Sequence, residues 1–336
     1  MKNYDFCIDI GSEYTTIYKK SSGIVLREPS IVLIEGTSKN LKAIEYGLNV
    51  KKYMGKLADE QVVVRPIVEG IIKNMDLTKK MLTYFLNKVI SYKLVKPAIN
   101  MVILLPVSLN QKQYNDYKDV FYSIGFNKLH FIYNAICASF ADNPYYCINK
   151  ANLFVNIGAD KTELACIVNN KIIDACSVSV GGSNIDKKIV EYFRKVKNYT
   201  ISESVACKIK EEIGSLYETD KSSMEVVAKD NATGKSISLV VTSKELLDIV
   251  YDIYYKIMQT IQAFLSDQSV EILQDIKNDG IIFYGGASTI TGLEKFAKKV
   301  LKLSVFVVDN PEVFACLGSE KLLSNIGLIE KINDEN

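Results

Sequence analysis

Residues 6–16, FCIDIGSEYTT, and their counterpart at 154–163, FVNIGADKTE, decide the fold of this chain. Each is an apolar, β-prone run, followed by an acid or its amide, an apolar residue, a glycine and a small polar turn, and then by a second β-prone run. This pattern predicts a β-hairpin. Glycine lets the turn backbone approach an anion, and the N–H and hydroxyl groups of the turn can donate to a phosphate. Two such hairpins, about 147 positions apart, indicate a duplicated fold that holds a nucleotide between its halves.

Length and composition are those of an ordinary soluble globular protein with room for two domains. The chain has 336 residues, of which 48% are hydrophobic and 24% charged,. A net charge of +2 gives no reason to expect a nucleic-acid partner,. Asp5 and Asp9 interrupt the N-terminal apolar run, so no signal peptide is predicted, and no uncharged stretch approaches the roughly 20 residues that cross a bilayer. Seven cysteines without a C-x-x-C motif favour reduced core thiols in a cytoplasmic protein over a zinc site,.

The same order of predicted elements occurs twice along the chain. Residues 4–34 form β-prone runs separated by turns, residues 76–91 have apolar side chains at helical spacing with Asp76 as the expected N-cap, and residues 99–105 form a buried strand,. The second half repeats the plan, with predicted helices over 182–196, 202–217 and 244–265, a hairpin over 224–242 and a strand over 281–284. Both halves therefore have strands followed by a helix, a strand and a helix, and this repeated order predicts an α/β duplication.

A third glycine turn, Gly285 to Thr289, follows the predicted strand 281–284. Any one of the three glycine turns taken alone is more often a plain tight turn than a ligand site. The order and spacing of all three turns within a duplicated α/β pattern are a much more specific signal than any one turn alone.

Together with these turns, five phrases resemble the actin, Hsp70 and sugar-kinase superfamily and, within it, the MreB family of bacterial actins. They are GIVLREPS at 23–30, VRPIVEG at 64–70, VGGSNID at 180–186, IKEEIGS at 209–215 and CLG at 316–318. The resemblance implies an α/β, actin-like duplicated fold of two domains with mixed sheets and a nucleotide cleft between them. It implies a domain I over 1–150, with a small subdomain near 31–75 and residues 315–336 packing back on it, and a domain II over 151–314, with a small subdomain near 181–245.

The resemblance also implies ATP or ADP with Mg²⁺ as cofactors and assigns residues to them. Asp9 and Asn156 fall at metal positions. Gly11, Ser12, Glu13 and Tyr14 are implied to form the first phosphate loop, and Gly158, Ala159 and Asp160 the second. Lys210 and Glu212 fall on the helix beside adenosine. The turn under the nucleotide is implied to be Gly285, Gly286, Ala287, Ser288 and Thr289.

Three of the departures from the family pattern bear on hydrolysis. Asn156 replaces an Asp, Asn134 stands where the family has the Glu that polarises the attacking water, and Lys161, beside Thr162, stands where it has the Thr that orients this water. General-base catalysis is worth roughly 10²–10⁴-fold, so these changes predict weak or residual ATPase activity. Lys161 could instead contact the γ-phosphate. The alternative is that both replacements are neutral and that another carboxylate, such as Asp160, has taken over the role.

The resemblance implies self-assembly into cytoskeletal filaments of paired protofilaments that support cell shape. Motility and paralogous MreB proteins as partners are further expectations. The lysine-rich, tryptophan-free composition and the altered positions suggest a divergent paralogue of the Spiroplasma type. Leu94 and Val95, flanked by lysines, suit weak peripheral contact of a cytoplasmic protein with an anionic membrane, although a plain exposed loop explains them equally well. Two rival functions are a small-molecule kinase of the same superfamily and a chaperone-type ATPase.

Overall fold

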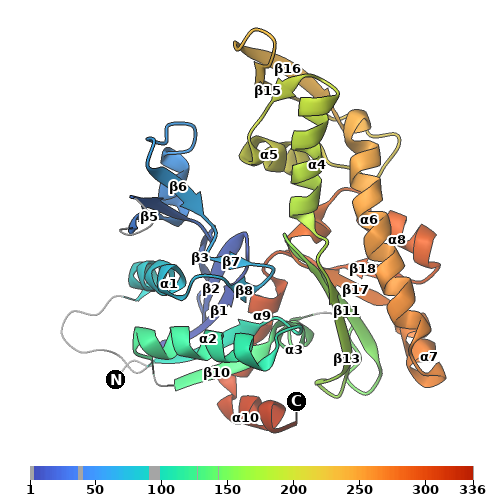
Figure 1. Ribbon diagram of the computed structural model, residues 1–336. Helices are drawn as coiled ribbons and strands as arrows, with labels where there is room; N and C mark the ends of the chain where they lie inside the picture. Colours follow the sequence, from blue (N-terminus) through green and yellow to red (C-terminus); the bar gives the residue numbers. More distant parts are fainter. Residues whose placement is uncertain (1–3, 37–40, 91–98, 127, 143, 336) are drawn as a thin grey trace. The chain divides into compact units, whose positions relative to one another are not determined.

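A computed structural model describes residues 4–36, 41–90, 99–126, 128–142 and 144–335 of the chain (Figure 1). The chain divides into two compact units. Unit 1 contains residues 1–148, 167–175 and 313–336, and unit 2 contains residues 149–166 and 176–312. Each unit is described by itself below.

Unit 1 is built on a five-stranded sheet in the order β10-β9-β1-β2-β3. These strands are β1 (Tyr4–Ile10), β2 (Tyr14–Lys19), β3 (Gly23–Pro29), β9 (Ile99–Leu105) and β10 (Lys128–Tyr133). The strands β1, β9 and β10 are parallel to one another, whereas β2 and β3 continue the sheet as antiparallel hairpins. Strand β9 reads INMVILL because a parallel strand in the middle of a sheet is covered on both faces,.

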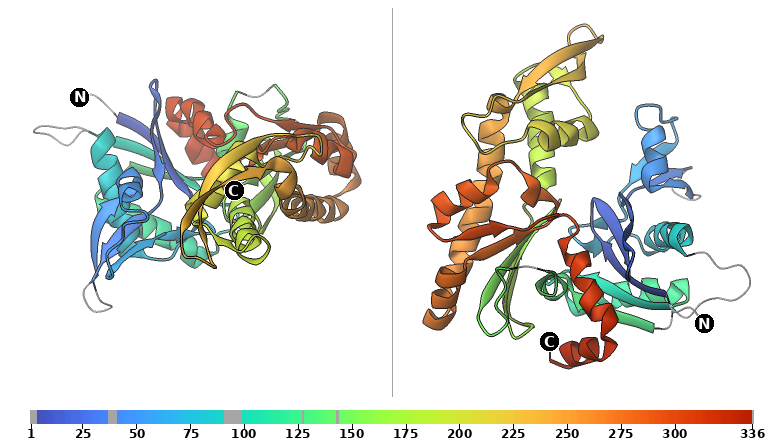
Figure 2. Two further views of the ribbon diagram at one scale, coloured as in Figure 1. Left: turned by 90° about the horizontal axis from the view of Figure 1, so that it is seen from above. Right: turned by 180° about the vertical axis from the view of Figure 1, so that it is seen from behind.

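Alternate residues of β1 contact different layers of unit 1. Phe6 and Ile8 belong to a hydrophobic core that includes α1 (Met75–Val89) and α2 (Gln111–Ile124). On the other face, α9 (Phe314–Ser324) contacts β1 and β9 and packs against α3 (Asn134–Ser139), while α10 (Ile326–Glu335) contacts β10 (Figure 2). This alternation follows from the two-residue period of a strand.

Two smaller sheets complete unit 1. The first is three-stranded, in the order β5-β4-β6, and the second pairs β7 with β8. Their bounds, with the adjoining 3-10 helix, are β4 (Val32–Glu35), β5 (Lys42–Tyr46), η1 (Gly47–Lys52), β6 (Gln61–Val64), β7 (Ile67–Val68) and β8 (Ile71–Ile72).

The second five-stranded sheet repeats the same order, β13-β12-β11-β17-β18, and belongs to unit 2 except for residues 167–175 at the hairpin between β12 and β13, which group with unit 1. The strands are β11 (Asn152–Ile157), β12 (Thr162–Val168), β13 (Lys171–Val178), β17 (Ile281–Tyr284) and β18 (Val305–Val307). As β1 does in unit 1, β11 has its hairpin partner on one side and a parallel strand, β17, on the other. Around this sheet, α6 contacts α4 and α8, and the small sheet β14-β15-β16 lies beyond α4 (Figure 1).

The remaining elements of unit 2 are α4 (Gly182–Lys195), β14 (Tyr199–Thr200), α5 (Glu203–Ile213), β15 (Ser223–Asp230), β16 (Ser236–Thr242), α6 (Ser243–Ser266), α7 (Val270–Asp279), η2 (Gly286–Thr289) and α8 (Leu293–Leu301). Helix α5 ends earlier than the predicted residue 217, because Ser215 leaves the helix to form a parallel bridge with Thr291. The N-cap of α1 also differs from the prediction: Asn74, not Asp76, accepts the N–H of Leu77 at 2.9 Å.

Among the described residues, no helix combines the length and the apolar character needed to cross a membrane. The expected membrane-contact residues Leu94 and Val95 lie outside the described part of the chain.

Candidate functional site

The turn between β1 and β2 is closed by a hydrogen bond across its tip. The N–H of Gly11 donates to the carbonyl oxygen of Tyr14 at 3.0 Å. A Cβ atom at position 11 would lie 2.9 Å from this oxygen, closer than real Cβ atoms come to a neighbour. Glycine is therefore required by the tightness of the turn, which brings Ser12 and Glu13 to its tip.

The turn between β11 and β12 has the same construction. The N–H of Gly158 donates to the carbonyl oxygen of Lys161 at 2.9 Å, and a Cβ atom at position 158 would lie 3.0 Å from this oxygen. Positions 11 and 158, and positions 14 and 161, are therefore equivalent in the two units. The sequence echo thus reflects the same local backbone arrangement.

The N-terminus of α4 is fixed to this second turn. The N–H groups of Gly182 and Ser183 donate to the carbonyl oxygens of Gly158 and Ala159 at 3.0 and 2.8 Å. A Cβ atom on Gly181 would lie 2.5 Å from both of these oxygens, so only glycine allows so close an approach. The turn is consequently held on a helix rather than standing free.

Each turn carries an ion pair that the sequence analysis missed. Glu13 pairs with Arg65 at 2.7 Å, and Lys161 pairs with Glu163 at 2.9 Å. The first pair joins residues 52 positions apart, and no sequence signal points to it. The second was accessible to sequence reasoning, because Lys161 immediately precedes β12, Glu163 lies on it, and residues two apart in extended chain point to the same side,.

Two further contacts hold the tips in place. The hydroxyl of Ser12 accepts the N–H of Gly70 at 3.2 Å in unit 1. In unit 2, the hydroxyl of the buried Thr162 donates to the carbonyl oxygen of Val180 at 2.8 Å. Thr162 thus has a structural role at the position next to Lys161.

Unit 1 brings together two of the predicted residues, Asp9 and Asn134. The side-chain amide of Asn134, at the start of α3, donates to Asp9 Oδ2 at 3.3 Å. Asn134 is buried. The amide therefore faces the carboxylate that the sequence analysis assigned to a metal ion, and an amide nitrogen cannot accept a proton from water at neutral pH.

Unit 2 brings Asn156 together with the third glycine turn. Asn156 on β11 pairs with Tyr284 on β17, immediately before Gly285. Gly285 has a φ of +92°, and a Cβ atom there would lie 2.2 Å from Asn156 Oδ1. Both the backbone conformation and the space require glycine at this position. Gly285 is thus fitted against the side chain of Asn156.

The rest of this turn is held by its own polar groups. The hydroxyl groups of Ser288 and Thr289 donate to the carbonyl oxygens of Tyr284 and Gly286 at 2.6 and 2.8 Å. The buried Tyr254 of α6 donates its hydroxyl to the carbonyl oxygen of Ala287. Burial, together with the nearby Asp186 carboxylate, raises the pKa of Tyr254, so this hydroxyl stays protonated and remains a donor.

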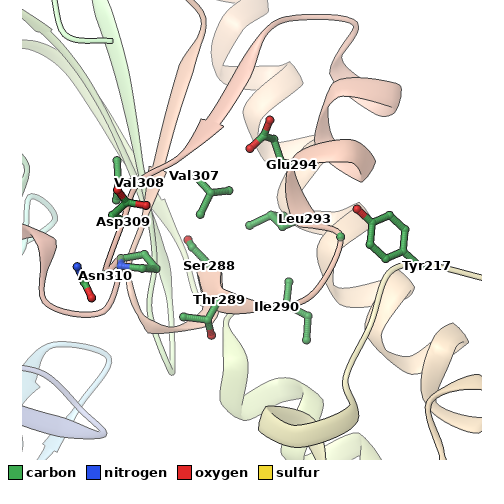
Figure 3. Close-up of a pocket in the computed structure, with 12 residues that line it drawn as sticks. Tyr217, Ser288, Thr289, Ile290, Leu293, Glu294, Val307, Val308, Asp309 and Asn310 are labelled. Carbon is green, nitrogen blue, oxygen red and sulfur yellow. The ribbon is translucent and has the colours of Figure 1, made fainter. Parts of the chain in front are cut away.

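A cavity of about 380 Å³ borders the turn and is lined by residues of unit 2 alone. Figure 3 shows Ser288 and Thr289 between the segment 307–310 and the side chains of Ile290 and Leu293. Its volume falls within the range of small-molecule sites, and carboxylate, amide and hydroxyl groups occur on its wall. Of the predicted residues, only Ser288 and Thr289 line it. The others on its wall, Tyr217 and Asn310 among them, carry no sequence motif.

The two predicted residues of α5 lie in different surroundings. The ammonium group of Lys210 is mostly buried, lies 2.9 Å from the Asp186 carboxylate of α4 and donates to the carbonyl oxygen of Gly182 at 3.3 Å. Glu212 is half exposed and pairs with Lys208 one helical turn away. Lys210 therefore joins α5 to the N-terminal end of α4, whereas Glu212 lies on the surface of unit 2.

Oxygen ligands for a divalent cation are sparse. Within the described ranges, no three His, Cys, Asp or Glu side chains are grouped as a metal site. Asp9 provides one carboxylate and Asn156 one neutral amide oxygen. Mg²⁺ is commonly held by one or two carboxylates together with the phosphates of its substrate, so Asp9 meets the lower end of this requirement.

Comparisons with known proteins identify relatives over almost the whole chain. The profile of the MreB/Mbl protein family matches residues 3–331. The cell shape-determining protein MreB of Escherichia coli is 28% identical over 333 residues, which cover 98% of this chain and 95% of that protein. The cell shape-determining protein Mbl of Bacillus subtilis is 25% identical over 328 residues, covering 97% and 98% of the two chains.

Solved structures confirm the predicted actin-like fold. The crystal structure of MreB5 of Spiroplasma citri bound to ADP superposes with a TM-score of 0.87 at 22% identity, covering 99% of both chains. The MamK double helical filament superposes with a TM-score of 0.80 at 16% identity, covering 96% of this chain and 99% of that one. The two glycine hairpins, the repeated sheet order and the family match over residues 3–331 lead to one conclusion: the chain belongs to the MreB/Mbl family of bacterial actin-like proteins.

Proposed function

We propose that this chain is a nucleotide-binding cytoskeletal protein that assembles into filaments, supports cell shape and hydrolyses ATP only slowly. The observation that carries the proposal is the pair of equivalent turns, closed by the Gly11–Tyr14 and Gly158–Lys161 hydrogen bonds. Its support from relatives is that Spiroplasma citri MreB5 was solved with ADP and with AMPPNP, and that MamK was solved as a double helical filament.

In this proposal the nucleotide phosphates are bound by the two turns. The first turn offers the N–H and hydroxyl groups around Ser12 and Glu13, with Arg65 neutralising the Glu13 carboxylate. The second offers the groups of Gly158, Ala159 and Asp160, on a backbone fixed to α4. Turns of this kind bind anions through successive backbone N–H groups. The turn Gly285–Thr289 and Lys210 belong to the half of the site that would receive adenosine.

Mg²⁺ bound with the nucleotide would screen the charge of its phosphates. Asp9 is the carboxylate placed to hold it, through its own oxygen atoms or a water molecule, and Asn156 could add an amide oxygen. The hydrogen bond from Asn134 orients the Asp9 carboxylate.

Slow hydrolysis follows from what the altered side chains can do. Asn134 donates to Asp9 and has no basic atom to receive a proton from water,. Lys161 has no hydroxyl and its ammonium group is paired with Glu163. The hydroxyl of Thr162 donates to the backbone of Val180 and is not available to orient a water molecule in this way. Loss of a general base slows a reaction by roughly 10²–10⁴-fold. Asp160 remains the carboxylate that could replace it.

Filament growth by this chain would be a head-to-tail assembly. Contacts between different faces of successive subunits extend linearly when the rotation from one subunit to the next does not close a ring. We infer pairing of protofilaments, co-assembly with paralogous MreB proteins and a cytoplasmic, membrane-associated location as further parts of the proposal. Membrane contact is assigned to Leu94 and Val95, which lie outside the described residues.

Sedimentation of the purified protein with Mg-ATP, with Mg-ADP and without nucleotide tests assembly, and phosphate release in the same tubes tests hydrolysis. We expect nucleotide-dependent pelleting with little phosphate release. Pelleting with rapid release would keep the filament and reject slow hydrolysis. A protein that phosphorylates a small molecule and never pellets would instead support the kinase alternative.

The double variant Asn134→Glu with Lys161→Thr should raise phosphate release by about tenfold or more, because it restores a carboxylate and a hydroxyl at the two positions. The matched control is Asn134→Gln with Lys161→Thr, which has the same side-chain size without the carboxylate. Equal phosphate release from both variants would show that Asn134 is not the reason for slow hydrolysis.

A further inference from the structure

Lys161 and Lys210 both form enclosed ion pairs, and Lys161 is the one that lies at the tip of a glycine turn. Its backbone oxygen closes this turn by accepting the N–H of Gly158. Its side chain is only 13% exposed, and its ammonium group lies 2.9 Å from the carboxylate of Glu163, which is 7% exposed. A full ion pair is thus enclosed at the second hairpin of unit 2.

The turn itself does not require a lysine. In unit 1, the equivalent position is Tyr14, whose carbonyl accepts the N–H of Gly11 at 3.0 Å, and its ring packs against the Arg27 guanidinium at 4.1 Å. The same backbone geometry is therefore reached with an uncharged side chain. Enclosing an ion pair costs desolvation free energy that the fold could avoid, so its presence at this turn points toward a ligand.

The surrounding residues favour an anionic ligand. Asn156, on the strand that leads into this turn, is neutral where a second carboxylate would serve a divalent cation. Lys161 lies immediately before β12 and pairs with the carboxylate of Glu163 on that strand. An ammonium group has three donors and can bond to more than one acceptor at once. Lysine also binds phosphate as a compact point charge.

We propose that Lys161, positioned by Glu163, is a resident counter-ion for the terminal phosphates of a nucleoside triphosphate. The chain then binds the triphosphate without an obligatory divalent cation, because the ammonium group supplies part of the positive charge that Mg²⁺ otherwise brings. This inference rests on the proposed nucleotide binding and adds a specific cationic group to it. No covalent step is involved.

The test is the affinity of the full chain for AMPPNP and for ADP, measured by calorimetry once with Mg²⁺ in excess over nucleotide and once with excess EDTA. We expect wild-type affinity for AMPPNP to fall by less than about tenfold in EDTA, which is about 1.4 kcal/mol. ADP, which lacks the terminal phosphate, should lose more affinity in EDTA than AMPPNP does.

Two variants assign the effect to Lys161. Lys161→Thr removes the ammonium group, and Lys161→Thr with Glu163→Gln removes both charges, so that no unpaired carboxylate is left enclosed and the net charge is unchanged. Both variants should still bind AMPPNP in Mg²⁺. In EDTA, the affinity of each variant for AMPPNP should be at least about tenfold lower than that of wild type. Lys161→Arg should keep part of that affinity. Lys195→Thr removes a lysine from an exposed Lys–Glu pair in the last turn of α4 and should change nothing.

The outcomes separate the two proposals. If wild type binds neither nucleotide in Mg²⁺, the proposed nucleotide function itself fails. If wild type binds in Mg²⁺ but not in EDTA, or if the folded double variant binds in EDTA as well as wild type does, Lys161 is not a counter-ion and the inference is wrong. Circular dichroism of each variant shows whether it is folded.

Discussion

His130 on β10 is the one histidine of the chain, and its surroundings make it sensitive to pH. Partial burial lowers the pKa of its imidazole, Glu330 of α10 acts in the opposite direction, and Lys128 adds to the lowering. The folded state therefore binds a proton less readily than the unfolded chain. Stability is complete above the unfolded pKa of about 6.5 and decreases as the pH falls through it toward the folded pKa.

We therefore expect the free energy of unfolding of wild type to decrease between pH 7.5 and pH 5.5 by more than that of His130→Gln. The two decreases should differ by less than about 1 kcal/mol, because the imidazole is only half-buried and solvent screens its interactions. Identical pH dependence of the two proteins would contradict the assignment. Urea unfolding at both pH values, monitored by circular dichroism, provides the measurement.

Single residues also show how far sequence reasoning reaches into the site. Gly11 and Gly158 could be identified because their local motifs repeat, and the motif carries its own turn geometry. Lys161 could be noticed as a departure from a pattern. The partner of Glu13 could not be found, since Arg65 reaches it only through the folding of β6 and β7 beside the first hairpin.

At the scale of elements, the contact between α9 and α3 depends on Gly318. A Cβ atom at this position would lie 1.8 Å from the carbonyl oxygen of Cys137 and 3.0 Å from the nitrogen of Ala141. Gly318→Ala should therefore push α9 away from α3 and lower the free energy of unfolding by about 2–3 kcal/mol, as overpacking does.

Gly327→Ala on the neighbouring α10 is the matched control. The nearest atom to its added Cβ is Asn325 Oδ1 at 3.7 Å, an ordinary contact. Since alanine favours a helix more than glycine does, this variant should be neutral or more stable by up to about 1 kcal/mol. Equal stability of the two variants in urea unfolding would show that α9 can shift without cost.

Element boundaries were less predictable than element types. The apolar spacing of residues 77–90 was sufficient to predict α1, but not to choose its N-cap. Asn and Asp are both good caps, and only the folded backbone places Asn74 rather than Asp76 beside the N–H of Leu77,. Helix α5 was predicted too long, because the bridge from Ser215 to Thr291 joins segments far apart in the sequence.

At the scale of the whole molecule, each unit has a central pair of parallel strands, β1 with β9 and β11 with β17. Their residues are buried, whereas the small sheets expose large side chains such as Val62 of β6 and Val227 of β15. Local opening should therefore be rarest in the central pairs. We expect amide hydrogen exchange to be at least about 100-fold slower there than in β5, β6 and the β15–β16 hairpin.

Hydrogen exchange followed by mass spectrometry under native conditions measures this ranking. Uniform protection across the large and small sheets would mean that each unit opens as a single cooperative body. The duplication itself was predictable because both halves had to encode the same order of strands and helices. The side-chain pairs within each half were not predictable, since ion pairs such as Lys210 with Asp186 join separate helices.

The membership of α9 in unit 1 has a consequence for synthesis on the ribosome. The first segment of unit 1 ends at position 148, but the unit also needs residues 313–336, so it must wait for 188 further residues. At roughly 5–20 residues per second, this delay is about 9–40 s. Unit 2, which ends at residue 312, can finish first. The face of β1 and β9 that α9 covers stays open to chaperones, or to neighbouring nascent chains, until residues 313–336 have been made.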